Sequence, residues 1–431
     1  MKKILYVTIV FGVMLGSYYG YRFYYQNLRG IGPAILPSAR NMDQLLEEQI
    51  KRESSPESVE PNTTGLPLIL PTKFSISVFA KDLGGPRVLA WDPNGVLLAS
   101  IPSQGRVVSI LRAIGEFRDD QVATVVEGLN RPHGIAFLGN TLYIAETNAV
   151  ATYDYDVNSH KATNRKKIID LPEGGNHFSR TIGFGPDGRL YIAVGSSCNV
   201  CNENDWRRAK ILVANADGSD LKEYATGLRN SVFFTWHPLT GEMWATEMGR
   251  DLIGDGIPPD EINLIKEGAN YGWPYCYGKN VTDLTFSSKG CQGAIASHID
   301  LQAHSAPLGL AFIPNRKPSS LKDEGANKIA TAKILTPSLW PEEYLGDLLV
   351  AYHGSWNRST PTGYKVVRMK LDSQGNYEGI EDFITGWLGH ASAAAGALGR
   401  PVDLLFDQKG NLYISDDKAG VIYRVTFHSF E

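Results

Sequence analysis

The sequence predicts an all-β fold: a six-bladed β-propeller, preceded by an N-terminal hydrophobic helix and a flexible tether. One turn-and-hairpin unit returns six times along the 431 residues. The turns of the first four copies are spaced by about 45 to 52 residues, a period typical of four-stranded propeller blades. The composition agrees, because 44 glycines and 20 tyrosines suit a turn-rich β protein with aromatic packing.

Each copy joins two apolar strands through a turn rich in Asp, Asn, Gly or Pro, the signature of a β-hairpin. The copies begin at Trp91, Arg131, Ile182, Val232, Pro307 and Arg400. Segments between them, such as RVVSILR and GYKVVRMKL, supply further strands. The strand FSISVFA, from Phe74, is expected to pair with VIYRVTF near the end of the chain and so close the ring. A β-sandwich fits six repeats poorly, and the period is too long for a β-helix.

The first 25 residues differ from the rest of the chain. Lys2 and Lys3 precede an apolar run over 4–20, and we interpret 1–25 as a signal-anchor or a signal peptide. A buried core helix is the alternative. Residues 26–67 are charged and rich in Ser and Pro, which predicts a linker, and 68–431 form the propeller domain. The expected location is extracytoplasmic, in the periplasm or at the cell surface, with membrane attachment through the N-terminal segment.

Cysteine content and net charge narrow the function classes. In an exported chain, four cysteines favour two disulfides, and the obvious pairing is Cys198–Cys201 and Cys276–Cys291. A redox-active Cys-x-x-Cys and half of a zinc site remain open. A formal net charge of -4 shows no basic footprint for nucleic acid.

In a propeller, the loops that enter the innermost strands meet at one mouth of the central channel. The residues just before the repeated units should therefore converge, and they are mostly cationic groups and imidazoles: Arg131, Pro132, His133, His177, Arg180, Arg229, Asn230, His304, Pro307 and Arg400. This pattern predicts a small polyanionic ligand in the mouth. The alternative is that the arginines clamp neighbouring blades together.

The stretch 247–278, after the fourth unit, is rich in Gly, Pro and Asp. Such a loop can direct carbonyl and carboxylate oxygens at a hard cation, and calcium prefers these ligands. Asp260 and Glu261 are the candidate side-chain donors. A solvated acidic loop is the alternative.

Five motifs together resemble the soluble PQQ-dependent sugar dehydrogenases, the glucose/sorbosone dehydrogenase family. They are RPHGIAF, HFSRTIGFGPDG, GLRN, DEINLIKEGANYGWP, and HGSWNRS followed by GYKVV. HGSWNRS is most similar to the sorbosone-type branch. The resemblance covers the chain from about Leu68 to the C-terminus and implies a six-bladed propeller, as the repeats indicate independently.

The resemblance also implies roles for individual residues. His177 matches the family's catalytic base, and Arg229, Asn230 and Arg400 match contacts to the quinone cofactor. The carbonyls of Gly249 and Arg250 match ligands of the calcium ion that accompanies the cofactor.

Glu261 and Tyr271 match ligands of a second, structural calcium. The sequence departs from the family at three places. Ser196 stands where the family has an aspartate near the histidine, and Val402 where it has a second arginine. A family lysine has no clear match, and His353 and Arg358 are the candidates for its place.

The resemblance therefore implies that PQQ and Ca²⁺ are the cofactors. The implied reaction is hydride transfer from an aldose or a sorbosone-like aldehyde to the quinone, with His177 as general base and Ca²⁺ polarising the quinone. Reoxidation requires an external acceptor, a quinone or a cytochrome. Two alternatives remain open: a non-catalytic exported binding module and a calcium-dependent lactonase-type hydrolase.

Overall fold

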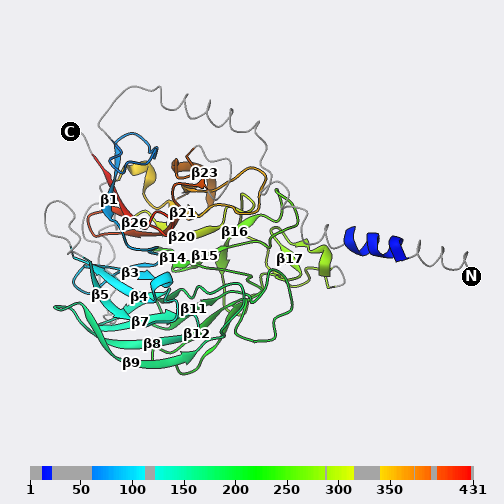
Figure 1. The fold of residues 1–431 in the computed structure, drawn as a ribbon, viewed down its shortest axis with the longest axis horizontal. Helices are drawn as coiled ribbons and strands as arrows, with labels where there is room; N and C mark the ends of the chain where they lie inside the picture. Colours follow the sequence, from blue (N-terminus) through cyan, green and yellow to red (C-terminus); the bar gives the residue numbers. More distant parts are fainter. Residues whose placement is uncertain are drawn as a thin grey trace, which may run out of the picture.

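The computed structural model describes residues 12–21, 61–111, 122–286, 289–314, 340–372, 374–389 and 396–428. Within these ranges, six four-stranded antiparallel sheets follow one another around the molecule (Figure 1). The predicted six-bladed propeller is therefore confirmed. A short helix covers 12–21, and no helix in the described ranges is both long and apolar enough to cross a bilayer. The predicted tether over 26–60 lies outside the described residues.

The sheets are called blades 1 to 6 in chain order. Blade 1 contains β2 (Leu89–Trp91), β3 (Leu97–Ile101), β4 (Arg106–Ile110) and β5 (Val122–Glu127); blade 2 contains β6 (Ile135–Leu138), β7 (Thr141–Glu146), β8 (Ala149–Asp156) and β9 (Lys161–Asp170); blade 3 contains β10 (Ile182–Phe184), β11 (Leu190–Val194), β12 (Lys210–Ala214) and β13 (Lys222–Thr226). Blade 4 contains β14 (Phe234–Trp236), β15 (Met243–Glu247), β16 (Asp260–Ile265) and β19 (Ile299–Leu301); blade 5 contains β20 (Pro307–Phe312), β21 (Leu348–Tyr352), β22 (Lys365–Leu371) and β23 (Tyr377–Ile384); blade 6 contains β24 (Pro401–Phe406), β25 (Leu412–Asp416), β26 (Val421–Phe427) and β1 (Phe74–Ala80). A hairpin of β17 (Cys276–Tyr277) and β18 (Val281–Thr282) and the 3-10 turns Pro102–Gln104, Leu284–Phe286 and Glu342–Tyr344 lie in the connections.

The first and last described strands of the propeller close the ring, as predicted. β1 pairs antiparallel with β26, with Phe74 opposite Phe427, and the two strands lie side by side in Figure 1. Closure removes the exposed edges that an open ring would present to other chains. Residues 61–67, which the sequence analysis assigns to the linker, also lie against β1, because Ile76 donates its N–H to the Pro61 carbonyl at 2.6 Å.

The first strands of the blades approach closely at the centre. β2 contacts β6 and β24, β6 contacts β10, and β20 contacts β14 and β24. Glycines make this approach possible: a Cβ on Gly134 would lie 2.5 Å from the Arg180 carbonyl, and one on Gly309 would lie 2.6 Å from the Asp403 Cα. The residues that precede these strands are therefore brought together at one end of the ring.

The hairpin turns follow from their aspartates. Asp92, Asp187 and Asp407 accept backbone N–H groups two residues further on, at 2.9, 3.1 and 2.8 Å. An aspartate that bonds its own backbone in this way initiates a tight turn. The recurring Asp in the repeated unit is therefore part of the scaffold.

Both predicted disulfides are present, Cys198–Cys201 and Cys276–Cys291. The first lies in the loop after β11, and the second joins β17 to the segment after β18. The described residues contain no free cysteine.

Candidate active site

The residues before the innermost strands gather as predicted, in two linked clusters. In the first, the Phe178 ring lies between blades: the Arg131 guanidinium is 3.7 Å from its centroid, that of Arg87 is 5.7 Å away, and the His133 ring is 6.0 Å away. Three elements distant in sequence therefore meet around one aromatic ring.

A chain of contacts extends the first cluster to blades 5 and 6. Asp417 accepts from Arg87 and lies 2.9 Å from His353 Nε2. Arg400 donates to the His353 carbonyl at 2.9 Å. The sequence analysis missed Arg87 and Asp417. Arg87 precedes the first repeated unit, so reading the residues before that unit would have identified it.

The second cluster surrounds His177. Its Nδ1 lies 2.9 Å from the Ser196 carbonyl and 3.0 Å from Ser196 Oγ. The carbonyl only accepts, and Oγ uses its proton to donate to the Cys198 carbonyl at 2.7 Å. Nδ1 must therefore carry the hydrogen, which leaves the lone pair of the neutral ring on Nε2. Ser196 thus orients the imidazole.

Burial and nearby cations keep His177 neutral. Burial lowers the pKa of His177 from 6.5 to about 3, and the positive charge of Arg229 adds to this effect. Backbone carbonyls hold the neighbouring guanidiniums: Arg180 donates to the His177 carbonyl at 3.0 Å, and Arg208 donates to the Gly174 carbonyl at 2.6 Å. The surroundings of the imidazole are therefore electropositive and suited to an anion.

Replacing Ser196 with aspartate is expected to raise the pKa of His177 by about 1 to 3 units, because a facing carboxylate favours the imidazolium. In the wild type the folded state binds fewer protons than the unfolded state between pH 6.5 and about 3. Stability therefore falls as the pH drops through this window, and the variant should reduce that loss. Histidine NMR titration and urea unfolding measure the two effects. Ser196→Asn is the uncharged control, and an equal pKa in both variants would contradict the expectation.

Arg229 is clamped by a set of acceptors. Its guanidinium donates to the carbonyls of Asn199 at 2.8 Å and Gly249 at 2.9 Å, and to the Asp251 carboxylate at 2.9 Å. Asp251 in turn accepts from Asn357 Nδ2 at 2.9 Å. The loop that carries HGSWNRS therefore lies beside the GLRN motif.

Three carboxylates, each at the end of the second strand of a blade, hold three loops of the channel mouth in place. Glu146, Glu247 and Asp416 end β7, β15 and β25, and they accept the N–H groups of Asn130 at 2.7 Å, Asn230 at 2.8 Å and Arg400 at 2.8 Å. Glu247 also accepts from Ser231 Oγ, and burial raises the pKa of Glu247 to about 8. The aligned carboxylates in AET, ATE and ISD are the sequence signal for these positioning residues.

Two predicted residues lie on the side of blades 4 and 5. His304 Nε2 is 2.8 Å from the Gly254 carbonyl, and Arg358 donates to the Ala303 carbonyl at 3.1 Å. Val402 is fully buried in the core, and its apolar side chain cannot replace an arginine contact.

The predicted calcium ligands lie around blade 4. The Gly249 carbonyl accepts from Arg229, and the Arg250 side chain donates to Asp283 at 2.9 Å. The Tyr271 hydroxyl donates to the Leu264 carbonyl, which leaves the backbone carbonyl of Tyr271 as its potential ligand. Glu261 accepts from Gly278 N–H at 2.6 Å, and burial raises the pKa of Glu261 to about 7.

The donor sets fit both cofactors. Asn263 is fully buried beside Glu261, and its Oδ1 has no hydrogen-bond partner among the described residues. Asn357 Oδ1, next to Asp251, is likewise buried and unpartnered. Orphaned oxygens beside a carboxylate, as at Glu261 and at the partly exposed Asp251, suit a hard cation. The arginines of the two clusters suit the carboxylates of PQQ.

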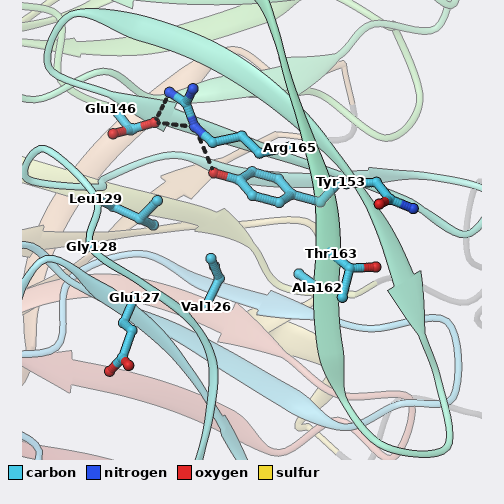
Figure 2. Close-up of a pocket in the computed structure, with 10 residues that line it drawn as sticks. Val126, Glu127, Gly128, Leu129, Glu146, Tyr153, Ala162, Thr163 and Arg165 are labelled. Atoms are coloured by element: carbon cyan, nitrogen blue, oxygen red, sulfur yellow. Dashed lines mark hydrogen bonds and ion pairs between the residues drawn. The ribbon is translucent and has the colours of Figure 1, made fainter.

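Two further features are a group of possible metal ligands and a cavity. Cys198, Cys201 and Glu203 are close enough to hold a metal, but the two sulfurs form a disulfide. A cavity of 430 Å³ opens between β5, β7, β8 and β9 (Figure 2). In it, Arg165 donates to Glu146 at 2.5 Å and to the Tyr153 hydroxyl at 3.1 Å. The lining also includes Gly128 and Leu129, which precede the loop that Glu146 holds through the Asn130 N–H.

The fold and the clusters define a class: six-bladed propellers with a basic, imidazole-bearing channel mouth. The TrAA12-like family matches residues 68–428, so the chain belongs to this family of PQQ-dependent sugar dehydrogenase-like proteins.

The chain is similar to several known proteins. An uncharacterized protein of Borreliella burgdorferi is 31% identical over 378 residues, which cover 84% of this chain and 91% of the relative. The pyrroloquinoline quinone-dependent pyranose dehydrogenase of Coprinopsis cinerea is 25% identical over 79% of this chain and 52% of the relative, so the chain spans about half of that relative's length. The calcium structure of the Trichoderma reesei family AA12 enzyme shares the fold, with a TM-score of 0.68 at 20% identity over 85% of this chain and 100% of that chain.

Proposed function

We propose that this protein oxidises an aldose or a sorbosone-like aldehyde with PQQ and Ca²⁺ as cofactors and His177 as general base. The observation that carries the proposal is a neutral imidazole with a free Nε2 lone pair in an electropositive setting. The name of the Coprinopsis cinerea relative, a PQQ-dependent pyranose dehydrogenase, supports the same cofactor and substrate class.

The residues divide the work of the reaction. When bound, PQQ with calcium supplies an electrophilic quinone carbon that accepts a hydride. His177 Nε2 takes the proton of the anomeric hydroxyl of an aldose, or of a hydroxyl of a hydrated aldehyde, as the carbon–hydrogen bond breaks. The products are a lactone and an acid, respectively. Arg229, Asn230 and Arg400 hold the cofactor, and Arg358 is a further candidate for this contact.

The positive potential around His177 serves the same step. The guanidiniums of Arg180 and Arg208 help to lower the pKa of His177, so the imidazole is neutral and able to accept a proton when the substrate binds. The carbonyls of Gly249 and Arg250 would hold the calcium beside the cofactor, and the Gly249 carbonyl also accepts from Arg229.

The HGSWNRS motif supports a sorbosone-type substrate preference, and an external quinone or cytochrome completes the cycle by reoxidation. The two disulfides support an extracytoplasmic location. A binding module or a lactonase-type hydrolase is less well supported. A hydrolase of that kind requires free carboxylates at the channel mouth. Two carboxylates at this mouth are instead held in ion pairs: Asp417 with Arg87 and Asp251 with Arg229.

The test of the function is reconstitution of the full chain with PQQ and Ca²⁺, followed by assays of aldoses and aldehydes with a dye acceptor. Substrate-dependent dye reduction is the expected result. Bound PQQ without turnover on any sugar or aldehyde would reject the proposal, and lactone hydrolysis without PQQ would favour the hydrolase.

Calcium is expected to stabilise the protein through Glu261. At about 100 times its dissociation constant, a bound ion adds about 2.7 kcal/mol to the free energy of unfolding, so the melting temperature should rise by several degrees. In the protein without PQQ, Glu261→Gln should remove the part of this rise that comes from the ion at Glu261 and Tyr271. Glu267→Gln, on an exposed glutamate that follows the same strand, is the matched control. An equal calcium effect in both variants would exclude Glu261 as a ligand.

A further inference from the structure

The loop after β11 contacts both His177 and Arg229, two groups of the proposed site. It runs from Ser196 to Cys201, and the Cys198–Cys201 disulfide closes a small ring around Asn199 and Val200. The proposed reaction does not use these cysteines, because both sulfurs are in the disulfide.

At one end of the ring, Cys198 is linked to His177 through Ser196. The Cys198 carbonyl accepts the Ser196 hydroxyl proton at 2.7 Å, and this leaves Ser196 Oγ as an acceptor for His177 Nδ1 at 3.0 Å. If this carbonyl moved, the serine hydroxyl would be free to donate to Nδ1, and this contact would compete with the Ser196 carbonyl, which favours the Nδ1–H tautomer. The position of the Cys198 carbonyl therefore helps to keep the lone pair on Nε2.

The next residue of the ring, Asn199, is hydrogen-bonded to Arg229. Asn199 uses its carbonyl and its Oδ1 to accept from Arg229 at 2.8 and 3.0 Å. The same Oδ1 accepts the Asp251 N–H at 2.8 Å, and Nδ2 donates to the Asp251 carbonyl at 3.1 Å. A single half-buried side chain thus holds together Arg229 and the loop that carries the Gly249 carbonyl.

A second contact holds the loop from outside the ring. Ser197 donates to Glu203 through its N–H at 2.6 Å and its hydroxyl at 2.8 Å. A covalent closure over two intervening residues removes most of the backbone freedom of Asn199, so its hydrogen bonds form at a low entropic cost.

We propose that the Cys198–Cys201 ring, through Asn199, is the positioning element that holds His177 in its basic tautomer and Arg229 in its cofactor-binding position. This proposal rests on the proposed function. A displacement of about 1 Å in such groups costs on the order of 100-fold in rate, so the site is fully competent only when this disulfide is formed.

The test compares the two disulfides of the same chain. The double variant Cys198→Ser/Cys201→Ser is expected to lower kcat/KM and PQQ affinity by at least about tenfold. The matched control Cys276→Ser/Cys291→Ser should stay within about twofold of the wild type in both quantities. Wild-type kcat/KM and PQQ affinity in the first variant would overturn the proposal.

Asn199→Ala tests the same element with the disulfide intact, so a folding defect of the cysteine variant does not remove the test. PQQ affinity, followed by absorbance, should fall at least about tenfold, and unchanged affinity would overturn the role of Asn199.

The side-chain ¹⁵N shifts of His177 are read in the cofactor-free protein. They should report the Nδ1–H tautomer in the wild type and a mixture in Cys198→Ser/Cys201→Ser. If the wild type shows no dehydrogenase activity while this change occurs, the proposed function fails and the positioning role stands. Identical shifts in both proteins would overturn the positioning of His177.

Discussion

Replacing His177 with alanine is expected to lower kcat by about 10²- to 10⁴-fold, the usual contribution of a general base. The reason is the arrangement at the ring: Nδ1 is held by Ser196, so the lone pair of the neutral imidazole lies on Nε2. PQQ affinity should change by no more than about twofold, because the imidazole acts on the substrate proton. Steady-state kinetics with a dye acceptor and a PQQ titration measure the two effects.

The control for this variant is His428→Ala. His428 is an exposed histidine beside β26 whose Nε2 lies 2.7 Å from Ser75 Oγ, and its loss should leave kcat unchanged. Wild-type turnover in His177→Ala would exclude this residue as the base. Equal loss in both variants would point to a general effect of removing a histidine.

Replacing Arg229 with lysine is expected to weaken PQQ binding by at least about 30-fold, since breaking a buried, hydrogen-bonded charge pair costs about 2 kcal/mol or more. A lysine keeps the charge but cannot make the three-sided contact with Asn199, Gly249 and Asp251. The measurement is an absorbance titration of the cofactor-free protein with PQQ in the presence of Ca²⁺.

Arg207→Lys is the matched control for this change. Arg207 also makes a forked contact, to Asp205 at 2.9 and 2.6 Å, but it lies outside the basic clusters. Its substitution should leave PQQ affinity unchanged. If Arg229→Lys binds PQQ as tightly as the wild type does, Arg229 is not part of the cofactor site.

The sequence was a good guide to the scaffold because the scaffold is periodic. Each blade repeats the same apolar strands and the same Asp-initiated turn, so spacing alone predicts the six sheets. The pairing of β1 with β26 followed from the need to cover the edge of the last blade. Residues 61–67, assigned to the linker, also lie against β1, while the family match begins at residue 68.

The candidate site was predictable in part. Residues that precede each repeated unit must converge in a closed ring, and Arg131, His177, Arg229 and Arg400 did so. Reading the first unit in the same way would have added Arg87. Nothing in the sequence pairs Arg87 with Asp417, which lies 330 positions away, because closure of the ring creates that contact.

The sequence by itself determined the blades, the disulfide partners and the cationic character of the channel mouth, since these depend on side-chain identity and on spacing. Only the tertiary structure decided how His177 is oriented and what clamps Arg229. The decisive groups there include the backbone carbonyls of Ser196, Cys198, Asn199 and Gly249. Every residue has a carbonyl, so its role depends on where the folded backbone directs it and is not encoded in the side chain.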